Sequence, residues 1–90
     1  MAQGIVVNPE QLMQLKATFD REGGSVAELS NTLGGQLDST VWEGRVADTF
    51  REEWHSQYAP TLQKLSEALQ QAGVDVQGAL NRALTADGQA

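Results

Sequence analysis

The feature of this chain that most limits its fold is an apolar repeat in the first half, with alternating spacings of three and four residues. Its members are Leu12, Leu15, Phe19, Glu22, Val26, Leu29 and Leu33, of which one is charged. The mean period is that of a coiled-coil seam, in which one stripe of a long helix packs against a neighbouring helix. The repeat therefore predicts a long helix packed against a second one.

The sequence contains signals for the start of this helix and two glycine pairs that could interrupt it. A capping residue, a proline and an acidic residue indicate the start: Asn8, Pro9 and Glu10. The pairs Gly23-Gly24 and Gly34-Gly35 lie inside it, and each interior Gly costs about 1 kcal/mol relative to Ala. They could divide the segment into two helices, but the apolar repeat keeps its phase through both. We predict one helix over residues 9–39, with a bend at Gly23 left open.

A second apolar stripe predicts a second helix over residues 46–84. Its members recur every three or four positions: Ala47, Phe50, Trp54, Tyr58, Leu62, Leu65, Leu69, Ala72, Val76, Leu80 and Ala83. Pro60 has no N–H and its ring crowds the carbonyl four residues earlier, so we expect a local kink there. The stripe resumes in phase, so the helix is not expected to end.

The connection at residues 40–45 joins two segments of similar length, which predicts an antiparallel helical hairpin. We expect one all-α domain over residues 1–90, with a flexible tail at 85–90. Folding about Trp42 would bring Glu22 level with Lys64, so we also expect an ion pair there.

A lone hairpin would be marginally stable, because each stripe has only one helix to pack against. Ordering the chain costs about 1.5 kcal/mol per residue, whereas fully burying a Leu, Phe or Val side chain returns about 1.5–3 kcal/mol. Two hairpins pairing into a four-helix bundle would cover the exposed halves of the stripes. We assign thirteen residues to the hairpin and dimer interfaces: Leu12, Leu15, Phe19, Val26, Leu29, Leu33, Phe50, Trp54, Tyr58, Leu62, Leu65, Leu69 and Val76.

Composition excludes several classes of function. Six Lys and Arg against twelve Asp and Glu give a net charge of -6, which repels a phosphate backbone, so no nucleic-acid partner is expected. The absence of cysteine excludes disulfides and thiolate metal sites. Helices that bind membrane surfaces usually carry a Lys/Arg-rich face, whereas these are acidic, so we expect no stable membrane insertion.

The sharpest enzymatic alternative is Glu52-X-X-His55, a spacing used for di-iron ligands in four-helix bundles. With Phe50 and Trp54 facing the core, Glu52 would project roughly 140° from the stripe centre. His55 and Ser56 diverge by about 100° and cannot pair as base and nucleophile through sequence proximity. We therefore predict no enzymatic activity, no small-molecule substrate, no cofactor and no catalytic or metal-binding residue.

Trp42-Glu43-Gly44 occupies the predicted turn. Gly44 can adopt a positive φ where the chain reverses, and Trp42 can cover the open end of the bundle. The pattern lies midway along a cysteine-free, two-helix chain and precedes an aromatic series, Phe50, Trp54 and Tyr58. In this combination the chain resembles the Trp-X-Gly (WXG) family of roughly hundred-residue substrates of type VII (ESX) secretion, to which the early secretory antigen proteins of mycobacteria belong.

The resemblance covers nearly the whole chain and implies a mode of action. Members of this virulence-associated family pair, as homodimers or heterodimers, into antiparallel four-helix bundles and are exported folded by a membrane ATPase. Trp42 and Gly44 would form a turn that contributes to a composite export signal. The other half-signal, Tyr-X-X-X-Asp/Glu, is best matched at residues 83–87, where Asp87 fits but Ala83 replaces the Tyr. This departure favours a heterodimer whose partner supplies the Tyr-bearing tail.

The expected location follows from the same resemblance. Residues 1–8 lack a basic leader, and the apolar run Ile5-Val6-Val7 is too short for a signal core. We therefore expect a secreted, extracellular protein that is cytoplasmic before export and uses a route independent of a signal peptide. The alternative is an intracellular helical scaffold or adaptor that is not secreted.

Overall fold

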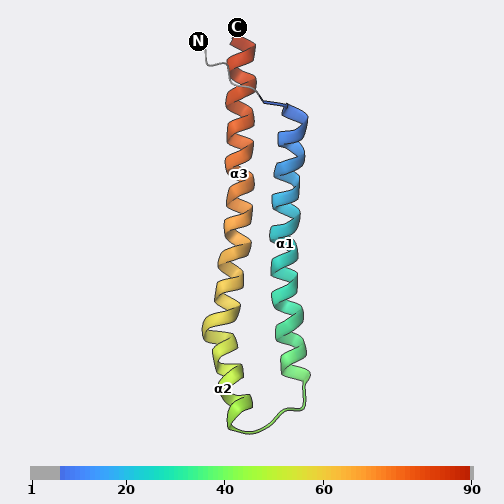
Figure 1. Cartoon of the computed structure of the whole chain (residues 1–90), viewed down its shortest axis with the longest axis vertical. Coiled ribbons are helices and arrows are strands. Elements are labelled where there is room, and N and C mark those ends of the chain that lie inside the picture. Colours follow the sequence, from blue (N-terminus) through green and yellow to red (C-terminus); the bar gives the residue numbers. More distant parts are fainter. Residues whose placement is uncertain (1–6, 90) are drawn as a thin grey trace.

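The chain folds as a long helical hairpin, which confirms the predicted all-α class. The structure, a computed structural model, describes residues 7–89, with side chains described through residue 85. Helix α1 (Pro9–Ser39) runs antiparallel to a second rod made of α2 (Arg45–Glu53), the π-helix η1 (Trp54–Tyr58) and α3 (Ala59–Gln89) (Figure 1). The second rod thus continues beyond residue 84, where the sequence predicted its end.

Helix α1 begins where the sequence predicts. The Asn8 side chain accepts a hydrogen bond of 3.0 Å from the backbone N–H of Gln11, and Pro9 opens the first turn. This bond satisfies one of the backbone donors that a helix start leaves free. The helix then runs without interruption through both glycine pairs to Ser39, which confirms the continuous interpretation.

Small residues line the contact between α1 and α3. Gly23, Ser66 and Gly73 are buried there. A Cβ on Gly23 would lie 3.0 Å from Gln70 Cγ and 3.1 Å from the backbone carbonyl oxygen of Ser66. The Ser66 hydroxyl donates a buried hydrogen bond of 2.7 Å to the Gly23 oxygen. The two helices therefore approach closely, and this bond fixes which residues lie side by side.

The large apolar side chains of α1 lie to one side of this contact. At about 100° per residue, the seven-residue repeat centres roughly 70° from the direction in which Gly23 faces α3. The large residues of α3 are displaced from Ser66 in the same rotational sense. Because the helices are antiparallel, equal displacements place both stripes on one face of the hairpin. We call this surface the apolar face; it comprises the thirteen residues assigned above to the interfaces.

The expected Glu22–Lys64 ion pair is wrong. Gly23, and not Glu22, faces α3, and the side chains of Glu22 and Lys64 are both exposed. Among the described side chains, the one ion pair joins Lys16 to Asp20 within α1. The rotation of α1 that brings its glycine against Ser66 turns Glu22 outward, where water solvates its charge.

The irregularity predicted at Pro60 is a short π-helix. The backbone N–H of Ala59 bonds to the Trp54 oxygen, five residues back, at the end of η1. Pro60 cannot donate to the carbonyl four residues back, and widening the preceding turn relieves the crowding by its ring. The helix continues into α3 without a break, as the apolar stripe indicated.

The hairpin is a thin rod with little enclosed core. It measures 67 × 19 × 14 Å, and its radius of gyration of 20.1 Å exceeds the roughly 12 Å of a compact domain of this length. It exposes 6580 Å², against about 5100 Å² for a compact protein of its mass. Within the described part of the chain, no large side chain is fully buried. Such a shape leaves apolar surface available for a partner.

Candidate functional site

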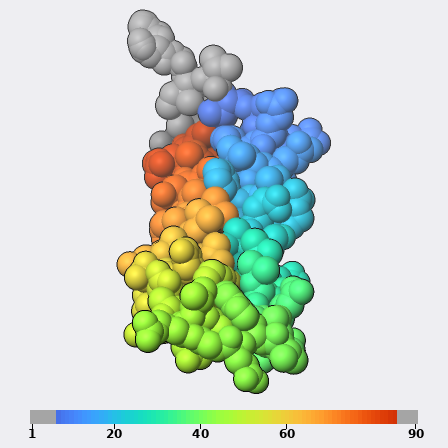
Figure 2. Space-filling view, turned by 60° about the horizontal axis from the view of Figure 1, so that its bottom comes forward, coloured from blue at the N-terminus to red at the C-terminus, as the bar shows by residue number. Residues whose placement is uncertain are grey.

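The Trp-X-Gly segment forms the connection between the rods. Gly44 has φ 118°, the only positive φ among the described residues, and caps the start of α2. Its carbonyl accepts a hydrogen bond of 3.0 Å from the Asp48 N–H. Positive φ strongly favours glycine, so the role predicted for Gly44 is confirmed. Seen from this end, the connection spans the width of the hairpin (Figure 2).

Trp42 joins a row of aromatic rings that extends from the turn along the second rod. The centroids of Trp42 and Phe50 are 5.7 Å apart, those of Phe50 and Tyr58 6.0 Å, and those of Trp54 and Tyr58 6.4 Å. These separations are typical of interacting aromatic pairs. Trp42 remains 38% exposed, so its ring is both held by neighbours and open to solvent.

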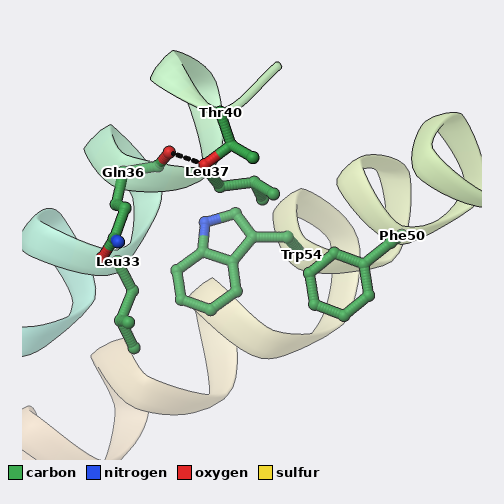
Figure 3. Close-up of a pocket in the computed structure, with 6 residues that line it drawn as sticks. All are labelled: Leu33, Gln36, Leu37, Thr40, Phe50 and Trp54. Carbon is green, nitrogen blue, oxygen red and sulfur yellow. Dashed lines mark hydrogen bonds between the residues drawn. The ribbon is translucent and has the colours of Figure 1, made fainter. Parts of the chain in front are cut away.

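Two hollows adjoin this row on the apolar face. The first, of about 300 Å³, is lined by Leu33, Gln36, Leu37, Thr40, Phe50 and Trp54 (Figure 3). The second, of about 260 Å³, is lined by Phe50, Trp54, Tyr58, Thr61 and Leu62. The indole of Trp54 projects toward α1 between Leu33 and Leu37 and is the one buried aromatic ring of the row. Phe50 and Trp54 line both hollows, and we call the two adjoining hollows the groove.

The other predicted interface residues are divided between half-buried and exposed positions. The half-buried ones are Leu12, Phe19, Val26, Leu62, Leu69 and Val76. The exposed ones are Leu15, Leu29, Leu33, Phe50, Tyr58 and Leu65. The hairpin therefore covers the inner edge of each stripe and leaves the outer edge in contact with solvent.

Arg51 is a functional candidate that the sequence analysis did not identify. Its guanidinium donates hydrogen bonds to three backbone oxygens of the turn region, those of Leu37, Thr40 and Trp42. It also lies 6.0 Å from the centroid of the Trp42 ring. A lone arginine on a helix gives no pattern by which these contacts could be found.

Of the two residues matched to the tail signal, Ala83 has a described side chain and Asp87 does not. Ala83 is buried, with 8% of its surface exposed, so the position where the family has Tyr presents little side chain to solvent. The side chain of Asp87 lies outside the described residues, although its backbone belongs to α3. The structure therefore brings Trp42 and Gly44 together but does not describe how Asp87 points.

The residues weighed for catalysis lie apart from the groove. Glu52, His55 and Ser56 are exposed on the second rod. Within residues 7–85, no group of three or more acidic or histidine side chains could hold a metal ion. None of the described helices is long and apolar enough to cross a membrane.

The fold and the turn define a class: small helical hairpins with a Trp-X-Gly turn and an exposed apolar face. A family model described as "Proteins of 100 residues with WXG" (WXG100) matches residues 4–88. The chain belongs to the WXG100 family of type VII secretion substrates. Neither the curated proteins nor the solved structures compared with the chain give a significant match.

Family membership brings a general function with it. WXG100 proteins are secreted, non-enzymatic helical proteins that work as partner-pairing secretion substrates. The chain is thus a small helical protein associated with type VII secretion.

Proposed function

We propose that this protein pairs through its apolar face with a second WXG-type hairpin and leaves the cell folded, as a substrate or co-secreted partner of the type VII export ATPase. The observation that carries the proposal is the apolar face itself, which is continuous along both rods and half exposed. The pair would act by binding proteins, with no catalytic step.

The size of the exposed surface supports pairing. The hairpin exposes about 1500 Å² more than a compact protein of its mass, which exceeds the roughly 800 Å² that each partner contributes to a standard interface. A four-helix bundle would insert partner side chains into the groove beside Trp54 and bury the outer edges of both stripes. The same burial would supply the stability that a lone hairpin lacks.

A heterodimer is the favoured form of the pair. The tail position 83 carries Ala, and that residue is buried, so a Tyr-bearing tail would have to come from a different chain. On this proposal Trp42 and Gly44 form the turn half of the export signal and Asp87 the remaining residue of this chain's tail signal. The export machine would read the turn of this hairpin together with the tail of its partner.

The first experiment is the molar mass of the full chain purified alone, by light scattering over a concentration series, together with its helicity by circular dichroism. A heterodimer-forming chain is expected to be a poorly helical monomer alone and to become helical with its partner. A helical dimer of the chain alone would replace the heterodimer by self-pairing. A stable helical monomer would contradict the argument from incomplete burial.

The second experiment separates export from an intracellular adaptor role. The protein is expected in culture filtrate, in amounts that depend on an active export ATPase. Retention in the cell with an intact ATPase and partner would favour the adaptor.

A further inference from the structure

Arg51 organises the turn that carries Trp42. Its Nη1 donates to the Trp42 oxygen at 2.7 Å, and its Nη2 donates to the oxygens of Thr40 at 2.9 Å and Leu37 at 3.3 Å. One side chain of the second rod thus holds three carbonyls of the connection and of the end of α1. A planar guanidinium with five donors is suited to bind several acceptors at once, whereas an ammonium is a compact charge on a flexible stem.

The electrostatics of this helix end support the same role. The last carbonyls of a helix have no partners within it and carry partial negative charge. The final turn of α1 contains no basic residue, and the acidic residue Asp38 lies within it. Arg51, half-buried against this end, supplies the positive charge from the opposite rod.

The same contact orients the exposed ring. The Arg51 guanidinium carbon lies 6.0 Å from the Trp42 ring centroid, within the range of cation–π attraction. The Phe50 ring lies 5.7 Å from the Trp42 ring. With its carbonyl bonded and its ring contacted by two side chains, Trp42 has a defined orientation although much of its surface faces solvent.

We propose that Arg51 is a positioning residue for export: it holds the turn so that Trp42 is already in the orientation that the export machinery binds. Pre-organising a binding loop lowers the cost of ordering it on association. The inference rests on the proposed function, because it assumes that the Trp42 turn is read during export. Arg51 acts through the turn: its guanidinium binds backbone oxygens, and its own side chain is not among the residues that line the groove.

The test compares Arg51→Gln and Arg51→Lys with Arg21→Gln, which removes an exposed arginine of α1 distant from the turn. Hydrogen exchange is measured by mass spectrometry on the full chain in the paired state that the first experiment establishes, in peptides covering residues 36–48. Losing the three bonds is expected to speed exchange in this region by about tenfold, because the Thr40 amide bonds to the Leu37 oxygen within the segment that Arg51 holds, and the Asp48 amide bonds to the Gly44 oxygen directly after it. Exchange within α3 and in the control is expected to stay unchanged.

Secretion is measured on the same variants, together with Trp42→Ala. We expect Arg51→Gln and Trp42→Ala to lose secretion, Arg21→Gln to keep it, and partner binding to survive in all of them. Arg51→Lys retains the charge and most of the stem and so is expected to fold, but its secretion should remain impaired because one ammonium cannot replace the fork.

Each of the other outcomes contradicts a specific part of the proposal. Unchanged exchange in Arg51→Gln, or full secretion of Arg51→Lys with native exchange, would remove the positioning role. Faster exchange with normal secretion of Arg51→Gln, while Trp42→Ala is retained, would also remove it but leave the proposed function standing. Normal secretion of both Arg51→Gln and Trp42→Ala would overturn the export role of the turn itself.

Discussion

Ser66 and Gly23 join the two long helices through a buried hydrogen bond, 2.7 Å from the serine Oγ to the glycine oxygen. The residues are 43 positions apart in sequence, so the bond reports on the register of the whole hairpin. It forms because the glycine has no side chain to separate the rods. Removing the hydroxyl and filling the space beside it are therefore two different perturbations.

Ser66→Ala removes the bond without adding bulk. The Gly23 oxygen lies inside α1 and remains available to the helix, so we expect a loss of about 0.5–1.5 kcal/mol in the free energy of unfolding. Ser66→Val adds methyl groups against Gly23 and is expected to cost more, about 1–3 kcal/mol. Urea unfolding of the paired protein at a fixed concentration measures both. Ser56→Ala, at an exposed position, is the control and should change stability by less than about 0.5 kcal/mol.

Gly23 and Gly24 form a matched pair, because they are adjacent in one helix but differ in what a methyl group would meet. A Cβ on Gly24 has nothing within 4 Å, so Gly24→Ala should stabilise the protein by about 0.5–1 kcal/mol through helix propensity. Gly23→Ala places its Cβ 3.1 Å from the backbone oxygen of Ser66 and should destabilise the protein by about 1 kcal/mol or more. Thermal unfolding of both variants checks the sign. Equal effects would contradict the close approach of the rods.

Leu65→Asp and Val74→Asp test which face binds the partner. Both residues are exposed, 46% for Leu65 and 57% for Val74, but at 100° per residue Val74 lies on the opposite side of α3 from the apolar face. We expect Leu65→Asp to abolish pairing, because an unpaired carboxylate buried in an interface is strongly unfavourable. Val74→Asp should pair normally. Co-purification and light scattering measure the outcome, and loss of pairing in both variants would refute the assignment of the face.

Trp42→Ala separates packing from export. The ring is partly exposed at the end of the rod, so the substitution should leave helicity and partner binding nearly unchanged. If the turn is read by the export machinery, secretion should fall to background. Circular dichroism, co-purification and the amount of protein in culture filtrate are the three measurements. A variant that fails to fold would show instead that Trp42 is chiefly a structural cap.

Residues with strong local preferences allowed much of the fold to be predicted. Asn8 and Pro9 indicated the start of α1, and Gly44 the positive φ of the turn. The rotation of α1 was missed because the large apolar residues dominate the repeat, whereas the closest contact is made by Gly23, which has no hydrophobic signal. Arg51 was missed because its acceptors are backbone oxygens, which every residue carries.

The irregularity before Pro60 was also predictable only in part. The missing N–H of a proline predicts a disturbed helix from sequence alone. Whether the chain bends, breaks or widens depends on how the neighbouring residues pack. Here Trp54 is buried against α1 at the start of η1, and the widened turn lets the rod continue while the indole keeps that position.

The glycine- and serine-lined contact has a consequence for passage through a channel. It keeps the hairpin only 19 × 14 Å in cross-section over a length of 67 Å. Two such hairpins stacked face to face would be about 28 Å thick, whereas one hairpin alone is 14 Å thick. The diameter of the conduit therefore decides the order of events: a wide pore admits the pair end-on as one body, and a narrow one requires the partners to part before they cross.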